Sequence, residues 1–549
     1  MNRRFAIFFA ALAVTLAGPA LAQGRLDRGR PLIASPDLVA PPVAAHTAAP
    51  APVETPERAD VMASPAAGVL VGSIRVEGAV VLRPSDFAPA IAPWLGQVLS
   101  ADELRAVATA VADVARGRGY IFARASIPRQ SLATGMLIVR IDEGRVDQVQ
   151  IEGGGHAGLE HILGVLANGR PVTRGALETA LLTAGDVPGM TVGAARLRRE
   201  DGRNILIVPV TYDRISGRAL LDNRGTSLIG PVRAQLGLDV NGLALRHDAL
   251  TIGGAITPAQ PREFRLASAR YAVQPGASGL EVGISGYYAK SAASGAFREL
   301  GITGENYEIA LDARQPLLRS RKASVWATGG FAVRRGRLDA GDSLTLRTDR
   351  VSALQFGLDG YGIAAGGVLH ATALASIGVG LFDATKLGDD LSSRPNGSGR
   401  FVAWNADFNW ARPLGKKFTL RVTGETQLAT RPLLVSEQFS LGGARLLRGY
   451  DYGERLGDEG AAGSLELSFR LPKTPKPVKR AELYAFVDGG KVSDKDSDYR
   501  SSLASAGGGV RMTVGPFTAA AEIAAPLTGP RYDSGNRSPR LSFTLAALF

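Results

Sequence analysis

The sequence contains no cysteine, which excludes a disulfide framework and thiolate metal sites. The apolar run Phe5–Leu16 is shorter than the ~20 residues that a membrane-spanning helix requires. With 45% hydrophobic and 21% charged residues, the chain resembles neither a disordered protein nor a bundle of membrane helices. These absences leave a protein whose stability depends on packing and on backbone hydrogen bonds.

Catalytic patterns are missing as well, since the sequence has no Gly-x-Ser-x-Gly motif and no Ser/His/Asp grouping. Residues Gly153–Gly158 match Gly-x-Gly-x-x-Gly, but Thr173 stands where a dinucleotide site needs Asp or Glu, so we expect a flexible turn. His156 and His161 would lie on different sides of a helix, and no carboxylate completes a zinc set. We expect no enzyme activity, no cofactor and no metal site.

Acidic residues are outnumbered, with 51 Asp and Glu against 63 Lys and Arg, which gives a net charge of +12. A basic chain invites a nucleic-acid interpretation. The arginines, however, alternate with apolar residues along the chain and do not form a patch with interleaved aromatics. A basic pore lining, or a surface beside anionic lipid, explains the charge better, and we expect no nucleic-acid partner.

The N-terminal residues 1–22 have the pattern of a secretory signal peptide. Arg3 and Arg4 precede the apolar run, and Ala20–Ala22 form a small-residue cleavage site. Residues 23–67 are rich in Pro and Ala, which predicts an extended linker. The mature chain should therefore begin outside the cytoplasm.

Residues 68–147 predict a small α+β unit. A strand is expected over Val69–Val76, a helix over Pro84–Leu95 and a second helix that begins with the Ser100/Glu103 capping box. Its apolar face comprises Leu104, Val107, Val111 and Val114, and two strands follow, near Ala123–Pro128 and Met136–Asp142.

Residues 148–213 repeat this order in shorter form, which indicates an internal repeat. Strands are expected over Val146–Glu152, Val192–Arg199 and Ile205–Tyr212, and helices over Leu159–Leu166 and Arg174–Thr183.

From residue 214 to 549 helix signals vanish and glycine is frequent, at 67 residues in the whole chain. We expect sixteen strands, beginning near Arg218, Val232, His247, Glu263, Gly279, Tyr307, Lys322, Leu346, Gly367, Phe401, Lys417, Gly463, Arg480, Leu503, Gly515 and Arg540. Alternating strands of about ten residues, even in number, are typical of a transmembrane antiparallel β-barrel. A soluble β-sandwich would alternate too, but it would show its polar face to solvent.

A long connection at residues 431–460 interrupts the barrel pattern between two alternating segments. It greatly exceeds an ordinary hairpin loop and carries a compact core around Arg448, so we expect a folded loop. In the strand near Arg480–Gly490, Leu483 and Val487 should face lipid, whereas Asp488 should face the lumen. Asp488 is a candidate partner for Arg448, and the alternative is that it is one of many pore-lining charges.

Two motifs resemble those of the POTRA-plus-barrel outer-membrane superfamily. Leu447–Tyr450 is similar to its (V/L)RG(Y/F) motif, and Phe486–Gly490 to its FxDxG strand motif. The segment Leu221–Thr226 and Gly230 resembles the barrel entry of the two-partner secretion transporters of the haemolysin and filamentous-haemagglutinin type. The resemblance covers nearly the whole chain, with residues 68–147 and 148–213 corresponding to two POTRA domains.

The resemblance implies that the loop folds into the lumen and is locked there. The lock residues would be Arg448, Gly449, Tyr450, Phe486, Asp488 and Gly490. It also implies that Phe549 is a signal to the barrel-assembly machinery. The expected partners are a secreted protein with a two-partner secretion domain and outer-membrane lipid, and the transporter would be a monomer in the outer membrane of a Gram-negative bacterium with POTRA domains in the periplasm.

Three other functions fit parts of this sequence. An insertase of the same superfamily would share the Arg–Asp pair, but such factors usually carry three or more POTRA domains. A plain porin would lack POTRA domains, and a barrel enzyme needs the catalytic grouping that is missing here. Secretion is therefore preferred, and a haemolysin, an adhesin or a haem-scavenging protein would fit equally as the partner.

Overall fold

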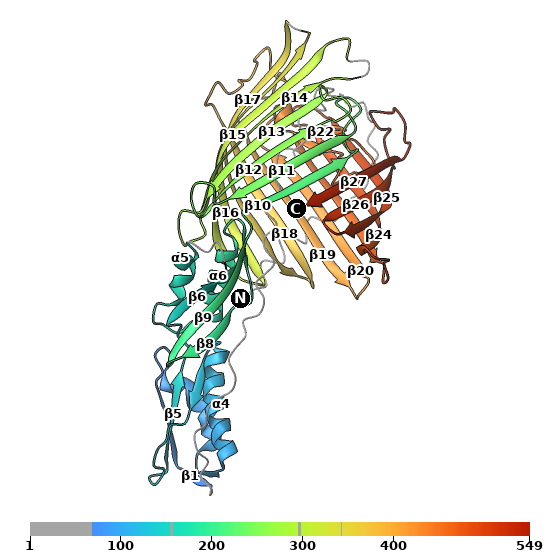
Figure 1. Cartoon of the computed structure of the whole chain (residues 1–549). Coiled ribbons are helices and arrows are strands. Elements are labelled where there is room, and N and C mark those ends of the chain that lie inside the picture. Colours follow the sequence, from blue (N-terminus) through green and yellow to red (C-terminus); the bar gives the residue numbers. More distant parts are fainter. Residues whose placement is uncertain (1–67, 154–157, 295–297, 342) are drawn as a thin grey trace.

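The computed structural model describes residues 68–153, 158–294, 298–341 and 343–549. Two α/β units form a column that leads into a β-barrel (Figure 1). The expected signal peptide and linker, and most of the glycine-rich turn 153–158, lie outside the described residues.

The first α/β unit contains two helices packed on a small sheet. Its elements are β1 (Val69–Val71), β2 (Ser73–Glu77), α3 (Pro84–Ile91), the 3₁₀ helix η2 (Ala92–Trp94), β3 (Gln97–Leu99), α4 (Ala101–Gly117), β4 (Arg124–Ser126) and β5 (Met136–Asp142). The predicted helix Pro84–Leu95 is thus shorter, because its last turn tightens into η2. The predicted strand Val69–Val76 is two strands, because β1 pairs with β3 whereas β2 pairs in parallel with β5.

Helix α4 begins at the predicted capping box. The Glu103 carboxylate accepts a hydrogen bond from the Ser100 backbone N–H at 2.7 Å, and hydrogen bonding to Ser100 lowers the pKa of Glu103. Leu104, Val107 and Val111 are buried against the sheet, as predicted, while Val114 lies at the edge of that core. The apolar stripe therefore orients the helix.

The second α/β unit has its own core. Its elements are β6 (Gln148–Glu152), α5 (Leu159–Leu163), the 3₁₀ helix η3 (Gly164–Leu166), α6 (Arg174–Gly185), β7 (Met190–Val192), β8 (Arg196–Glu200) and β9 (Arg203–Tyr212). The predicted strand Val192–Arg199 is wrong, because β7 and β8 pair with different parts of β9. The parallel pair β6–β9 corresponds to β2–β5 in the first unit, so the topology repeats.

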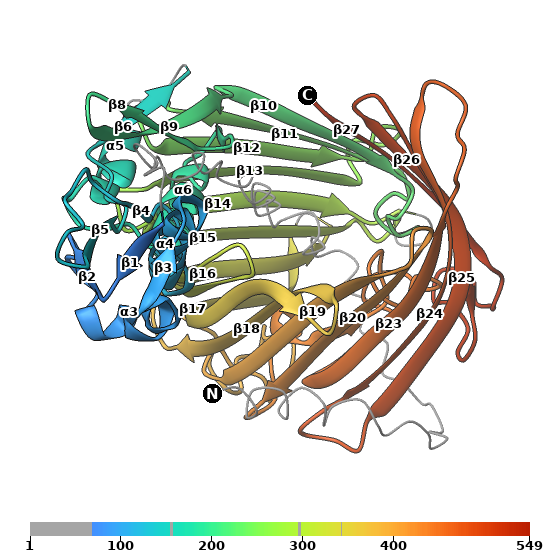
Figure 2. The ribbon, with the colours of Figure 1, turned by 90° about the horizontal axis from the view of Figure 1, so that it is seen from below.

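The barrel closes with sixteen antiparallel strands, the number that the sequence predicts. They are β10 (Ile215–Asp222), β11 (Arg233–Asn241), β12 (Asp248–Ile256), β13 (Phe264–Val273), β14 (Glu281–Ala292), β15 (Ile302–Arg319), β16 (Ala323–Ala340), β17 (Leu344–Ala364), β18 (Gly367–Val379), β19 (Val402–Leu414), β20 (Phe418–Ala429), β23 (Glu459–Arg470), β24 (Val478–Ser493), β25 (Arg500–Val514), β26 (Phe517–Pro526) and β27 (Arg540–Leu548). Figure 2 shows the barrel from below, with its strands in chain order around the wall.

The barrel closes by pairing β10 with β27, so its first and last strands leave no free edge. Phe549 extends this seam, because Gly217 and Phe549 exchange backbone hydrogen bonds of 2.6 and 3.0 Å. The Phe549 ring lies over Gly217, where a Cβ would come within 2.4 Å of it.

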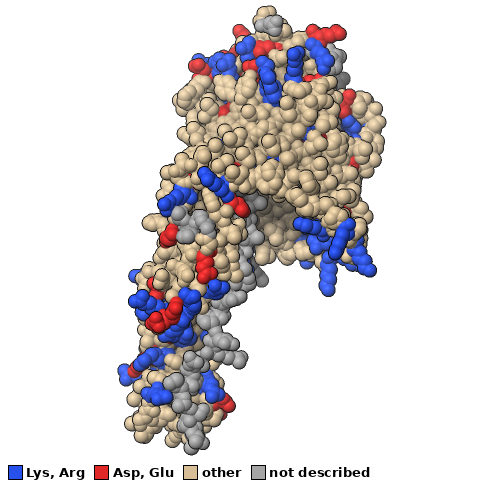
Figure 3. All heavy atoms as spheres, in the orientation of Figure 1, with Lys and Arg blue, Asp and Glu red and all other residues tan. Residues whose placement is uncertain are grey.

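Alternate residues of the barrel strands face outward and are apolar. Leu465, Leu467, Leu483 and Val487 are exposed, whereas Glu466 and Asp488 on the opposite parity are buried inside. Charged side chains accordingly gather at the two ends of the barrel and leave an uncharged band between them (Figure 3). This pattern matches a wall that meets lipid. None of the helices among the described residues is long and apolar enough to cross a membrane.

Arg319, at the end of β15, joins the second α/β unit to the barrel. Its guanidinium donates to Asp186 at 2.7 Å and to the Leu182 carbonyl at 3.3 Å, both at the end of α6. Burial outweighs this favourable charge and raises the pKa of Asp186 to about 6.

Candidate functional site: the loop inside the barrel

The long loop is a folded hairpin. It spans residues 430–458 between β20 and β23, and it contains the 3₁₀ helix η5 (Val435–Glu437) and the paired strands β21 (Phe439–Leu441) and β22 (Arg455–Gly457). The sequence predicted the loop but not this hairpin. At its turn Gly442 has a φ of +99° and its Cβ position lies 2.0 Å from the Asp451 carbonyl oxygen, so a side chain cannot be accommodated there.

The loop places Arg448 against the lumen face of β24. Arg448 donates to both carboxylate oxygens of Asp488, from Nε at 3.2 Å and from Nη2 at 3.0 Å. The backbone N–H of Arg448 donates to the same carboxylate at 3.0 Å. Both side chains are almost fully buried, so the pair is a charge-assisted contact shielded from water.

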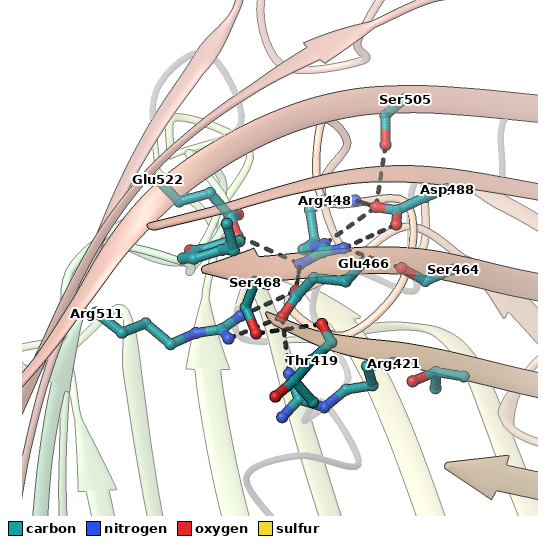
Figure 4. A network of polar contacts seen from close by, with 12 residues as sticks. Thr419, Arg421, Arg448, Ser464, Glu466, Ser468, Asp488, Ser505, Arg511 and Glu522 are labelled. Carbon is teal, nitrogen blue, oxygen red and sulfur yellow. Dashed lines mark hydrogen bonds and ion pairs between the residues drawn. The ribbon is translucent and has the colours of Figure 1, made fainter. Parts of the chain in front are cut away.

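Two further carboxylates complete the surroundings of Arg448, as Figure 4 shows. Glu466 on β23 accepts from Nη1 at 2.9 Å, and Glu522 on β26 lies 3.5 Å from the same nitrogen. Ser464 accepts from Nη2 at 2.9 Å. The predicted one-to-one pair is therefore a network that joins the loop to three barrel strands.

Two of these carboxylates, Glu466 and Glu522, are shared with further arginines of the barrel. Glu466 also accepts from Arg511 and Arg421, at 2.7 to 2.9 Å, and Glu522 accepts from Arg224 at 2.9 Å. Four arginines thus meet three carboxylates, and this near balance of charge lowers the cost of burying the network.

Sequence reasoning missed Glu466 and Glu522 as site residues. Glu522 is the single charged residue of β26 and lies on its lumen parity, which is a signal the sequence does contain. What the sequence lacked was the register that places Glu466 and Glu522 near the same guanidinium.

Phe486 lies on the same face of β24 as Asp488 and packs against Arg448. The guanidinium carbon of Arg448 lies 3.3 Å from the centroid of the Phe486 ring, a cation–π contact. The ring also fills the space beside Gly507, where a Cβ would lie 2.7 Å from it.

Tyr450 anchors the loop to β27 and to the β26–β27 loop. Its side chain is fully buried, and its hydroxyl donates to the Gly529 carbonyl at 3.1 Å in the β26–β27 loop. Arg540 on β27 donates to the Tyr450 carbonyl at 3.2 Å and pairs with Asp451. The loop thus contacts the last strand as well as β23 and β24.

Gly449 and Gly490 are needed because the loop comes close to the wall. A Cβ on Gly449 would lie 2.9 Å from Ser505, and a Cβ on Gly490 would lie 2.7 Å from Leu441 of the loop. Leu441 packs with Leu447 and Tyr450 in an apolar cluster beneath the hairpin. All six predicted lock residues therefore lie at the contact between the loop and the wall.

A second ion-pair group holds the two ends of the loop, and the sequence did not reveal it. Asp458 is fully buried, accepts from the Leu433 backbone N–H at 2.9 Å and pairs with Arg394 of the β18–β19 loop. Arg394 also donates to Asp496 at 2.8 Å. The acidic run Asp494–Asp498 therefore helps to hold this arginine.

The arrangement pairs buried charges and joins the loop to the barrel wall. Every carboxylate around Arg448 is engaged with arginine, and no cluster of His, Cys, Asp or Glu suited to a metal ion occurs within the described ranges. A closed sixteen-stranded barrel with α/β units before it and a folded loop packed inside defines a POTRA-plus-barrel outer-membrane protein.

The family model of the haemolysin secretion/activation protein ShlB/FhaC/HecB matches residues 201–512, and that of the ShlB-type POTRA domain matches residues 69–144. The chain therefore belongs to this family of outer-membrane two-partner secretion transporters. Family members act in transport, not as enzymes, and barrel and family together place the protein in the outer membrane of a Gram-negative bacterium.

Curated relatives include the outer membrane transporter CdiB of Escherichia coli, 26% identical over 84% of this chain and 79% of the relative. The heme/hemopexin transporter protein HuxB of Haemophilus influenzae is 22% identical over 79% of each. The structure of CdiB from Escherichia coli superposes with a TM-score of 0.71 at 23% identity, over 91% of this chain and 94% of the other. The structure of BamA from Haemophilus ducreyi lacking POTRA domains 1–3 shares the fold at a TM-score of 0.52 and 14% identity, over 87% of this chain and 100% of that chain.

Proposed function

We propose that the protein recognises an unfolded secreted partner through two POTRA domains, residues 68–147 and 148–213, and exports it through the barrel without nucleotide hydrolysis. The observation that carries the proposal is the folded loop inside the barrel, which the Arg448 network joins to the wall. Its contacts with the wall are polar pairs and one compact apolar cluster. Because these contacts are grouped around one segment, they can break together when the loop moves. Export would require the loop to move or to leave room for the client.

Edge strands of the POTRA domains are the proposed capture surface. Among the described elements, β4 of the first domain pairs only with β5. The other edge of β4 can therefore accept an added strand. Strand addition gains backbone hydrogen bonds without demanding a sequence, which suits an unfolded client. We assign initial recognition to this domain.

The lock is the proposed role of Arg448, Gly449, Tyr450, Phe486, Asp488 and Gly490, and Phe549 is the proposed signal for barrel assembly. The transporter is proposed to work as a monomer. The signal peptide of residues 1–22 would direct it out of the cytoplasm, and the linker of residues 23–67 would precede the POTRA domains.

Deletion of residues 68–146 tests the function. The protein is expressed with a candidate partner, and the partner is compared in medium and periplasm with and without the deletion. Loss of the partner from the medium, with a heat-modifiable barrel intact, supports a POTRA-dependent exporter. Normal export together with failed assembly of other outer-membrane proteins would instead favour the insertase.

A further inference from the structure

Lysine is distributed very unevenly in this chain. The sequence holds ten lysines, and five of them lie close together: Lys416 and Lys417 in the β19–β20 turn, Lys473 and Lys476 in the β23–β24 turn, and Lys479 at the start of β24. Because β20 pairs with β23, these two turns are neighbours on the barrel rim. Both turns are at the end of the barrel that carries the α/β units.

These five residues form one patch, here called the lysine rim. Every one of them is exposed, and among the described residues none forms an ion pair. No acidic residue occurs in 411–418 or 470–480, and Arg412 and Arg470 add further exposed positive charge. Figure 3 shows this blue group below the uncharged band, on the side away from the α/β column.

The depth of the lysine rim is set by aromatic residues on the lipid-facing wall. Phe418 and Phe469 are register partners on β20 and β23, with ring centroids 5.1 Å apart, and Phe418 is 43% exposed. Exposed aromatic pairs of this kind mark the boundary between hydrocarbon and headgroups. Lys417 directly precedes Phe418, so the lysine rim lies one step beyond that boundary, at headgroup depth.

We propose that the lysine rim binds the phosphate groups of anionic phospholipids in the periplasmic leaflet. A lysine beside a bilayer keeps its alkyl stem on apolar surface while its ammonium reaches the headgroups. Each basic residue near an anionic surface adds attraction, so five unpaired lysines at two adjoining turns favour anionic over zwitterionic lipid. This contact would hold the side of the barrel rim that lies away from the POTRA domains at a defined depth in the membrane.

Native mass spectrometry of the full-length protein in detergent tests the proposal. Phosphatidylglycerol and phosphatidylcholine with identical acyl chains are titrated separately, and we expect about tenfold tighter retention of phosphatidylglycerol. The variant with all five lysines changed to Gln should lose this preference, and K416Q/K417Q should lose part of it. The matched control R321Q/K322Q, on the β15–β16 turn, should retain it. A heat-modifiability assay confirms that each variant is folded.

Three results overturn the proposal. The first is equal retention of both lipids by the native protein, and the second is a preference that survives in the five-lysine variant. The third is binding of a polyglutamate peptide to the lysine rim without any lipid preference, which would assign it to an acidic polypeptide. Competition by excess inorganic phosphate distinguishes a site for free phosphate, since a membrane-bound headgroup resists it.

Discussion

The guanidinium of Arg448 lies over the ring of Phe486, with its carbon 3.3 Å from the ring centroid, and donates to the carboxylate of Asp488 at 3.0 Å. Phe486 and Asp488 are two residues apart on β24 and therefore project from the same face. One strand thus supplies both the apolar platform and the counter-charge, which explains the spacing of the two motif residues.

Replacing Arg448 by alanine should abolish secretion while the barrel stays in the membrane. It would leave Asp488 buried with fewer donors, a loss that typically costs about 3–5 kcal/mol. Secretion of the partner and heat modifiability of the barrel are the measurements. Arg445→Ala is the control, because Arg445 is exposed and its ion pairs with Glu425 and Asp407 are worth little. Normal secretion by the Arg448 variant would contradict the proposed role of Arg448 in holding the loop.

Glu522→Gln tests whether the network extends beyond Asp488. It removes a charge that faces Arg448 and Arg224 and that accepts from the Tyr484 hydroxyl at 3.0 Å. We expect thermal unfolding at lower temperature and non-additive behaviour in a double-mutant cycle with Arg448→Ala, with a coupling of about 0.5–3 kcal/mol. Strict additivity would show that Glu522 is independent of the lock.

Gly490→Ala and Gly489→Ala form an adjacent pair with opposite expectations. A Cβ at Gly490 would lie 2.7 Å from Leu441 and displace the loop, whereas a Cβ at Gly489 meets no atom within 4 Å. The first variant should raise channel conductance in planar bilayers, and the second should leave it unchanged. Equal conductance of the two variants would contradict close packing of the loop at Gly490.

Arg394→Gln should loosen both ends of the loop without touching Arg448. It removes the partner of buried Asp458 and a 2.9 Å hydrogen bond to the Leu433 carbonyl. We expect faster cleavage of residues 430–458 by protease added outside whole cells. Lys386→Gln, an exposed substitution on the same β18–β19 loop, is the control. Unchanged cleavage would assign the hold on the loop to the Arg448 network alone.

The contact between Asp186 and Arg319 should depend on pH. The pKa of Asp186 is raised from 3.8 to about 6 when the second α/β unit is docked, so protonation favours the docked state. This contribution is complete below pH 3.8, is lost as pH rises through 6, and amounts to at most about 3 kcal/mol. Crosslinking between α6 and the β15–β16 turn should therefore increase from pH 7 to pH 5, and Asp186→Asn should flatten the profile.

The sequence by itself determined the two α/β units, the number of barrel strands and the face of each alternating strand, because these follow from local periodicity. It also singled out Arg448 and Asp488, since a long loop and an inward carboxylate are local features. It misplaced the divided strands at Val69–Val76 and Val192–Arg199, where the choice of partner strand decides the boundary.

Only the tertiary structure decided which charges surround the loop. Glu466, Asp488 and Glu522 come from three strands and converge on Arg448 through barrel register, and Asp458 meets Arg394 from a loop 64 residues away. Periodicity specifies the face on which a side chain lies but not its height along the barrel axis. The height at which these groups meet is set by closure of all sixteen strands, which no single stretch of sequence contains.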